Sequence, residues 1–249
     1  MTEHKPRAWR NALAVLAALV VGWQILHAVV GEVALRSPWE TVAYTAKLFA
    51  SRDFWPNFDE TMTAFAAALA IAVATGLAIG MLLGFSRLAG EVFEPVLVAL
   101  YSIPKVTLYP IVLLAFGLGM QAKIAFGAIH GIIPIALFTI NAVRNVRPIL
   151  IKTGRVMKLT TWEMVWQVLF PAAIPEIFTG LRIGFSLTLI GTLLGEMFAS
   201  QRGLGYMLMN GIGLHNVDVI MSVTFMLVVF AAVISSALLA IDRVLHGRA

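Results

Sequence analysis

Long apolar runs separated by short polar blocks dominate the pattern of this chain. A helix needs about 20 predominantly apolar residues to cross a bilayer. Runs of that length predict six spans, at residues 11–30, 60–85, 92–117, 122–143, 175–199 and 217–243. The third is the least regular, because Pro104 and Pro110 interrupt it. The pattern therefore predicts an all-α, polytopic membrane protein with about six transmembrane helices.

Composition supports this class. Of the 249 residues, 60% are hydrophobic and only 12% are charged, whereas a soluble domain needs more charge to stay in water. The chain has no cysteine, which excludes disulfides, thiolate metal sites and a cysteine nucleophile. Its net charge of +5 comes from basic residues that stand in short blocks between apolar runs. That placement is typical of membrane topology, so no nucleic-acid partner is expected.

The basic residues also predict the orientation, because cytoplasmic loops are enriched in lysine and arginine. With a cytoplasmic N-terminus and six spans, both termini lie inside. The predicted cytoplasmic segments then hold Lys5, Arg7, Arg10, Arg87, Arg144, Arg147, Lys152, Arg155, Lys158, Arg243 and Arg248. The outer segments hold fewer, namely Arg36, Lys47, Arg52, Lys123 and Arg202. The expected location is the cell inner (plasma) membrane.

Two regions are predicted. Residues 1–59 comprise an N-terminal tail, the first span and an outer segment. The first apolar run is long for a signal-peptide core and no small-residue cleavage site follows, so we expect it to be retained. Trp39, Trp55 and Phe58 suit the headgroup region, which favours short interfacial helices in the outer segment. Residues 60–245 form a core of five spans with a polar insert at 144–171.

Small residues recur at four-residue spacing in two spans, and such stripes let helices approach closely in lipid. They are Gly76, Gly80 and Gly84 in the second span, and Gly180, Gly184, Thr188, Thr192 and the adjacent Gly195 in the fifth. One interpretation is packing within the chain. The other is that Gly184, Thr188 and Thr192 line a pathway or a subunit interface.

The insert at 144–171 is organised like two short helices. Pro148 can begin a helix that runs to about Lys158. Thr160-x-x-Glu163 is a capping-box pattern that starts a second helix, and Pro171 is expected to end it. Trp162, Val165, Trp166 and Leu169 recur at helical spacing and are expected to face the membrane domain. Arg155, Lys158 and Thr161 are expected to face outward.

The residue pattern leaves two interpretations of this basic, amphipathic insert open. It could lie on anionic lipid at the membrane surface. It could instead be a docking element for a soluble partner, whose acidic groups would meet the bases.

The insert resembles the cytoplasmic coupling loop of ATP-binding cassette (ABC) importer permeases. That family has Glu-Ala-Ala, three residues, Gly, and then about nine or ten residues to an apolar-Pro pair. Alignment on Phe170-Pro171 puts Lys152, Thr153 and Gly154 under Glu-Ala-Ala and Lys158 under the glycine. Glutamate and glycine are thus both replaced by lysine here.

Other stretches carry the same resemblance, which covers roughly residues 60–245. "LGFSRLAGEVFEPVLVALYSIPKVTLYPIVLLAFGLG" (Leu83 to Gly119) is similar to the family's second and third spans, and "GEMFASQRGLGYMLMN" (Gly195 to Asn210) to the end of its fifth. These stretches resemble the branch that imports sulfonates, taurine, nitrate or thiamine-precursor pyrimidines.

The resemblance implies a permease subunit that forms a dimeric pathway for a small, anionic or heterocyclic solute. Its implied partners are cytoplasmic ABC ATPase subunits, an extracytoplasmic substrate-binding protein, a second permease copy and the lipid bilayer. The residues implied in ATPase coupling are Lys152, Thr153, Gly154, Arg155, Lys158, Leu159, Thr160, Thr161, Trp162 and Pro171.

Nothing in the residues supports an enzyme or a bound cofactor. There is no Gly-x-x-x-x-Gly-Lys-Ser/Thr phosphate loop, so ATP hydrolysis is expected on a separate chain. The histidines are scattered without metal-ligand spacing, and no nucleophile elbow occurs. A self-contained secondary transporter or channel is the alternative, although such proteins often show internal repeats that are not evident here.

A few polar groups at membrane depth are candidates for the substrate pathway, because such residues are costly and usually functional. Lys105 follows Pro104 and could attract an anion, or it could snorkel to the membrane interface or pair with Glu196. His130 could contact substrate or be a satisfied histidine of the bundle. Glu196, near the outer end of the fifth span, could be a pathway residue or structural.

Overall fold

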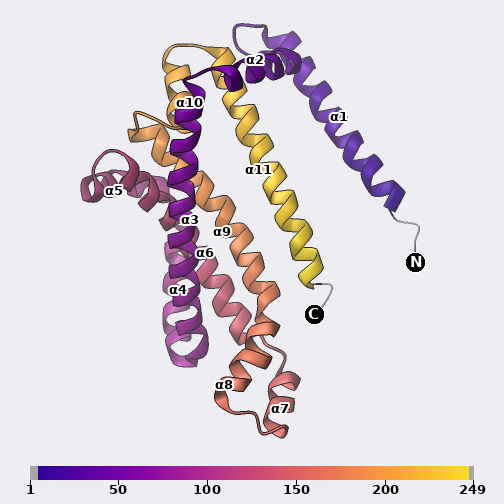
Figure 1. Cartoon of the computed structure of the whole chain (residues 1–249), viewed down its shortest axis with the longest axis vertical. Coiled ribbons are helices and arrows are strands. Elements are labelled where there is room, and N and C mark those ends of the chain that lie inside the picture. Colours follow the sequence, from indigo (N-terminus) through magenta and orange to yellow (C-terminus); the bar gives the residue numbers. More distant parts are fainter. Residues whose placement is uncertain (1–4, 247–249) are drawn as a thin grey trace. The chain divides into compact units, whose positions relative to one another are not determined.

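In the computed structural model, which describes residues 5–246, every regular element is a helix (Figure 1). The outermost parts of the predicted tail and C-terminus, including Arg248, lie outside the described residues. Five helices are long and apolar enough to cross a membrane. They are α1 (Lys5–Val30), α3 (Phe54–Phe85), α6 (Met120–Arg144), α9 (Phe170–Ala199) and α11 (Val217–His246). The predicted spans at 11–30, 60–85, 122–143, 175–199 and 217–243 are therefore confirmed as helices.

The predicted third span is broken. Helix α4 (Arg87–Ser102) is followed by a short 3₁₀ turn, η1 (Lys105–Leu108), and by α5 (Tyr109–Phe116), with a bend of 88° between the two parts. Pro104 lies at the break, where a proline cannot continue the hydrogen bonding of α4. The irregularity predicted from Pro104 is confirmed.

The two parts of this broken segment nevertheless reach opposite ends of α6. The Arg144 guanidinium, at the end of α6, donates to Glu94 and to the Arg87 carbonyl of α4. Tyr109 of α5 packs on Phe126, near the start of α6, with ring centroids 4.9 Å apart. The segment thus contacts α6 near both of its ends, and it is the sixth candidate span of the described residues if the bent pair is counted as one.

Contacts divide the chain into two units. One comprises residues 1–56 and 207–229, and the other residues 57–206 and 230–249. The boundary after residue 56 lies close to the predicted boundary at 59/60, but the first half of α11 falls in the unit of the N-terminal helices.

The first unit contains the predicted interfacial helix, α2 (Pro38–Ala50). Ser37 caps it through a capping box with Glu40, and the hydrogen bonds from Ser37 hold the pKa of the Glu40 carboxyl below its usual value. Arg36, just before the cap, pairs with Asp218 of α11 at 2.8 Å. Trp23 of α1 donates its indole N–H to the Arg36 carbonyl.

The second unit is centred on α6, which packs against both α3 and α9. A Cβ at Gly76 of α3 would lie 2.8 Å from Ile135 of α6, and one at Gly84 would lie 2.9 Å from Val143. A Cβ at Gly180 of α9 would lie 2.5 Å from Phe138 of α6. Both small-residue stripes therefore serve packing within the chain, because only glycine lets the backbones approach this closely.

Candidate functional site

The insert between α6 and α9 lies at one end of the second unit, below α6 and α9 in Figure 1. It consists of α7 (Pro148–Val156), a turn, α8 (Thr161–Glu163) and η2 (Met164–Leu169), which continues into α9. The prediction of two short helices joined by a turn near residues 158–161 is confirmed. Helix α7 begins at Pro148 as expected and ends two residues before Lys158.

The turn after α7 is a Schellman motif. The Leu159 N–H donates to the Gly154 carbonyl at 3.1 Å and the Lys158 N–H to the Arg155 carbonyl at 3.0 Å. Lys158 itself has φ of 54°, in the left-handed region that favours glycine. This conformation gives a physical reason for a glycine at the equivalent family position.

Gly154 joins the two halves of the insert. It is buried, and a Cβ there would lie 2.6 Å from Cε and 2.8 Å from Sδ of Met164 in η2. Helix α7 thus packs directly on η2. A methionine tip can move, so the alanine that the family carries at this position fits with a small shift.

The predicted capping box starts the second helix. The Thr160 N–H donates to Glu163 Oε2 at 2.8 Å, and the Glu163 N–H donates to Thr160 Oγ1 at 3.3 Å. These bonds satisfy backbone donors that the first turn of a helix cannot satisfy itself. The first turn of the helix that follows is therefore rigid.

Of the four residues expected to face the membrane domain, Val165 and Leu169 are half-buried, but the expectation is wrong for Trp162 and Trp166. Trp162 and Trp166 are 69% and 50% exposed. Their ring centroids lie 5.5 Å apart, and the Trp166 ring also packs on Phe170 at the start of α9, at 5.3 Å. The reason is that residues 164–169 form a π-helix, so the assumed helical spacing does not hold. Nor does Pro171 end the helix, since α9 begins at Phe170 with a proline in its first turn.

Most of the predicted coupling residues form an exposed surface. Arg155, Lys158 and Thr161 point outward as expected. Gly154 is buried and Leu159 is half-buried, whereas the others are exposed, namely Lys152, Thr153, Thr160, Trp162 and Pro171. A groove of about 730 Å³ lies between the insert and the adjoining ends of α6 and α9, lined among others by Arg147, Leu150, Gln167, Pro171 and Glu176.

The stripe of α9 proposed for the pathway is packed against α6. Thr188 and Thr192 are fully buried, and they fill the spaces beside Gly131 and Gly127. Gly184 meets Ile135, since a Cβ there would lie 2.6 Å from its Cδ1. We therefore assign Gly184, Thr188 and Thr192 to packing within the chain rather than to the pathway.

His130 is a satisfied histidine of the bundle. Its Nδ1 lies 2.8 Å from the Phe126 carbonyl, and its ring packs edge-on to Phe126. Lys105 does not pair with Glu196. Its ammonium donates to the Tyr101 carbonyl at 3.1 Å and lies 4.6 Å above the Tyr101 ring, in a half-buried position at the break between α4 and α5.

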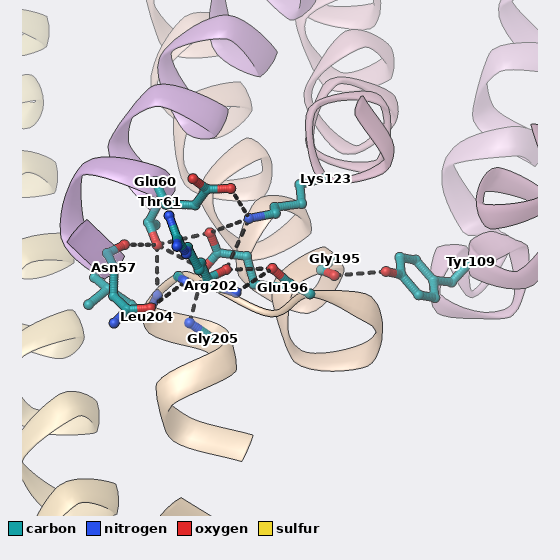
Figure 2. A network of polar contacts seen from close by, with 12 residues as sticks. Asn57, Glu60, Thr61, Tyr109, Lys123, Gly195, Glu196, Arg202, Leu204 and Gly205 are labelled. Carbon is teal, nitrogen blue, oxygen red and sulfur yellow. Dashed lines mark hydrogen bonds and ion pairs between the residues drawn. The ribbon is translucent and has the colours of Figure 1, made fainter. Parts of the chain in front are cut away.

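Glu196 instead belongs to a buried polar cluster at the end of α9 away from the insert (Figure 2). The Thr61 hydroxyl lies 2.9 and 2.8 Å from its two carboxylate oxygens, and the Lys123 ammonium is 3.8 Å away. Lys123 also donates to Glu60 at 2.9 Å. No role was predicted for Lys123 beyond that of an outer basic residue, and none for Glu60 or Thr61, although a lysine and a glutamate at the ends of predicted spans were a signal.

Comparison with known proteins identifies the family. Residues 76–249 match the model of the family described as "Binding-protein-dependent transport system inner membrane component". This match spans more than half of the chain, including α6, the insert and α9.

The chain belongs to this family. It is a permease subunit of an ABC importer.

The permease aligns with curated relatives over most of the length of each relative. It is 27% identical to a "Putative aliphatic sulfonates transport permease protein" of Bacillus subtilis, over 83% of this chain and 75% of the relative. It is 26% identical to a "Taurine transport system permease protein" of Escherichia coli, over 80% and 74%. It is 31% identical to a "Nitrate import permease protein" of Synechocystis, over 82% and 76%. These relatives confirm the predicted branch.

A solved structure shows the same fold. The permease matches the inward-facing MetNI methionine ABC transporter with a TM-score of 0.66 and 23% identity, over 80% of this chain and 96% of that one. The insert therefore belongs to a permease that has the fold of a solved ABC transporter permease.

Proposed function

We propose that two copies of this permease form a pathway across the inner membrane, driven by cytoplasmic ABC ATPase subunits that dock on the insert. A binding protein outside delivers the solute. Both termini lie in the cytoplasm, so the insert faces the ATPase and the loop between α9 and α10 (Leu204–Gly213) faces outward.

The observation that carries this proposal is the rigid, basic tip of the insert. Arg155 and Lys158 are exposed on a turn that is closed by two backbone hydrogen bonds and braced by the Gly154–Met164 contact. A rigid element can transmit movement of the ATPase to α9, into which the insert continues without a break. These two basic residues suit an acidic surface on the ATPase.

The solute is a small anion or heterocycle. Support comes from the relatives, whose names specify aliphatic sulfonates, taurine, nitrate and formylaminopyrimidine. Lys105 offers a cation at the broken crossing, where irregular backbone is tolerated when it faces a cavity. We propose Lys105 as a solute contact, because a half-buried ammonium there attracts an anion strongly.

Two measurements test the proposed function. The permease is expressed with the ABC ATPase chains of the same cell, purified in detergent and assayed for a stable complex that hydrolyses ATP. Uptake into vesicles is then measured for sulfonates, nitrate and pyrimidines. Uptake that proceeds in the absence of ATP and of any ATPase would refute the proposal and favour a self-contained transporter.

A further inference from the structure

Four successive residues at the junction of α9 and α10 are each bound through their backbone by a side chain from another part of the chain (Figure 2). Lys123 donates to the Arg202 carbonyl at 3.0 Å. The Gly203 N–H donates to Asn57 at 2.8 Å, the Leu204 N–H to Thr61 at 2.8 Å, and the Gly205 N–H to Glu196 at 2.9 Å. The donors of Leu204 and Gly205 belong to the first turn of α10, which cannot satisfy them itself.

The side chains that bind this backbone also hold one another. Glu196 is fully buried and Lys123 is 1% exposed, so their charges depend on their partners. Thr61 links Glu196 to the Leu204 N–H, and Glu60 neutralises Lys123 at 2.9 Å. Gly203 has φ of 122°, and a Cβ there would collide with the Glu196 carboxylate.

Such a cluster is costly, because each buried ion gives up its hydration. Buried ionic groups can be retained because they specify one arrangement rather than because they add stability. Here the specified arrangement is that of the loop, since α3, α6 and α9 all contribute a side chain that binds its backbone. The side chains of Gln201 and Arg202 are left exposed on this fixed backbone.

We infer that the Ser200–Gly203 loop is a docking surface that presents the Arg202 guanidinium to a carboxylate of the solute-binding protein, and that Glu196 and Lys123 are its positioning residues. This inference rests on the proposed function, which places the loop outside. Arginine suits the role because its planar guanidinium can bind a carboxylate with two parallel hydrogen bonds. A fixed backbone lowers the ordering cost of binding.

The first test uses trypsin, which cuts after exposed arginines in mobile loops. In the purified ATPase complex, cleavage between Arg202 and Gly203 is expected to be slow. Lys123→Met removes one of the four backbone contacts, and Glu196→Gln weakens another because its acceptor loses its charge. Each change is expected to speed cleavage by roughly tenfold. Glu91→Gln removes the carboxylate of an exposed ion pair on α4 and serves as the control with unchanged cleavage. Equal cleavage of all four proteins would overturn the positioning roles.

The second test measures how much solute-binding protein is needed for half-maximal stimulation of ATP hydrolysis, using the binding protein that stimulates the unaltered complex. Arg202→Glu is expected to raise this concentration by roughly tenfold, with Glu196→Gln acting in the same direction. Arg52→Glu, the same change at another exposed base of the predicted outer side, is the control. If Glu196 only stabilises the fold, Glu196→Gln lowers the maximal rate of ATP hydrolysis but leaves the half-maximal concentration of binding protein unchanged.

The proposed function and the docking inference are refuted by different results. If the unaltered permease binds no ABC ATPase, both the proposed function and this inference are refuted. If the unaltered complex is stimulated and Arg202→Glu requires no more binding protein than Arg52→Glu, the docking inference alone is refuted. Arg202 is exposed, so its variant keeps the test decisive even where Glu196→Gln prevents folding.

Discussion

The Lys123 ammonium and the Glu196 carboxylate lie 3.8 Å apart, and both side chains are buried. Lys123 lies in the first turn of α6 and Glu196 in the last turn of α9, so their pairing ties two helices that lie side by side but are far apart in sequence. Removing one charge leaves the other buried and less well compensated.

This relationship predicts a non-additive double mutant. Lys123→Met alone is expected to destabilise the second unit by about 3–5 kcal/mol, because Glu196 and Glu60 lose their cation. Adding Glu196→Gln is expected to restore part of that loss, since the remaining buried anion disappears. The stability of the single and the double variant is measured by unfolding in denaturant, with the yield of folded protein in detergent as a second measure. Strict additivity of the two changes would contradict the pairing.

The proposed topology predicts from which side of the membrane introduced cysteines can be labelled. The chain has no cysteine, so single cysteines report their side of the membrane without background. A cysteine at Arg155 is expected to react with an impermeant maleimide only after the cells are opened. A cysteine at Gln201 is expected to react in intact cells. Labelling of residue 155 from outside would refute the proposed orientation.

Charge reversal at the insert should remove the ATPase. Arg155→Glu with Lys158→Glu turns two exposed bases into acids on the surface proposed to meet an acidic seat. Co-purification of the ATPase is expected to fall at least about tenfold, while membrane insertion stays intact. The control is Arg243→Glu, an exposed base near the end of α11. If the double variant binds ATPase as well as the control does, neither base is part of the contact.

Lys158→Gly should stabilise the insert. Lys158 occupies the left-handed region at φ of 54°, which costs a residue with a side chain roughly 1 kcal/mol relative to glycine. Lys158→Ala loses the charge but keeps the strain, and is therefore the matched control. Hydrogen exchange at Lys158 and Leu159, whose amides close the turn, is expected to slow in the glycine variant only. Equal exchange in both variants would show that the strain is absent.

The interface between α6 and α9 should not tolerate a methyl group at Gly131. A Cβ at Gly131 would collide with Thr188 and lie 2.9 Å from Ala72 of α3. Gly131→Ala is expected to cost about 1–3 kcal/mol through overpacking. Gly22→Ala has open space around it and is expected to be neutral or slightly stabilising. Thermal unfolding of the two variants checks this, and similar melting temperatures would refute the close packing.

The sequence by itself determined the local features. Hydropathy gave the positions of the long helices, because a span must be apolar over about 20 residues wherever it packs. Pro104 indicated the break in the third crossing, and Thr160 with Glu163 indicated the start of α8, since both act within one turn of helix. The insert was recognisable because its two helices depend on signals a few residues apart.

Only the tertiary structure decided which faces meet. Whether Thr188 and Thr192 line a pathway or fill the space beside glycines of α6 depends on a helix that lies about 60 residues earlier in the chain. Glu196 accepts from Thr61, which is 135 positions away, and no local spacing encodes that contact. The exposed Trp162 and Trp166 follow from a π-helical register that the spacing of apolar residues does not reveal.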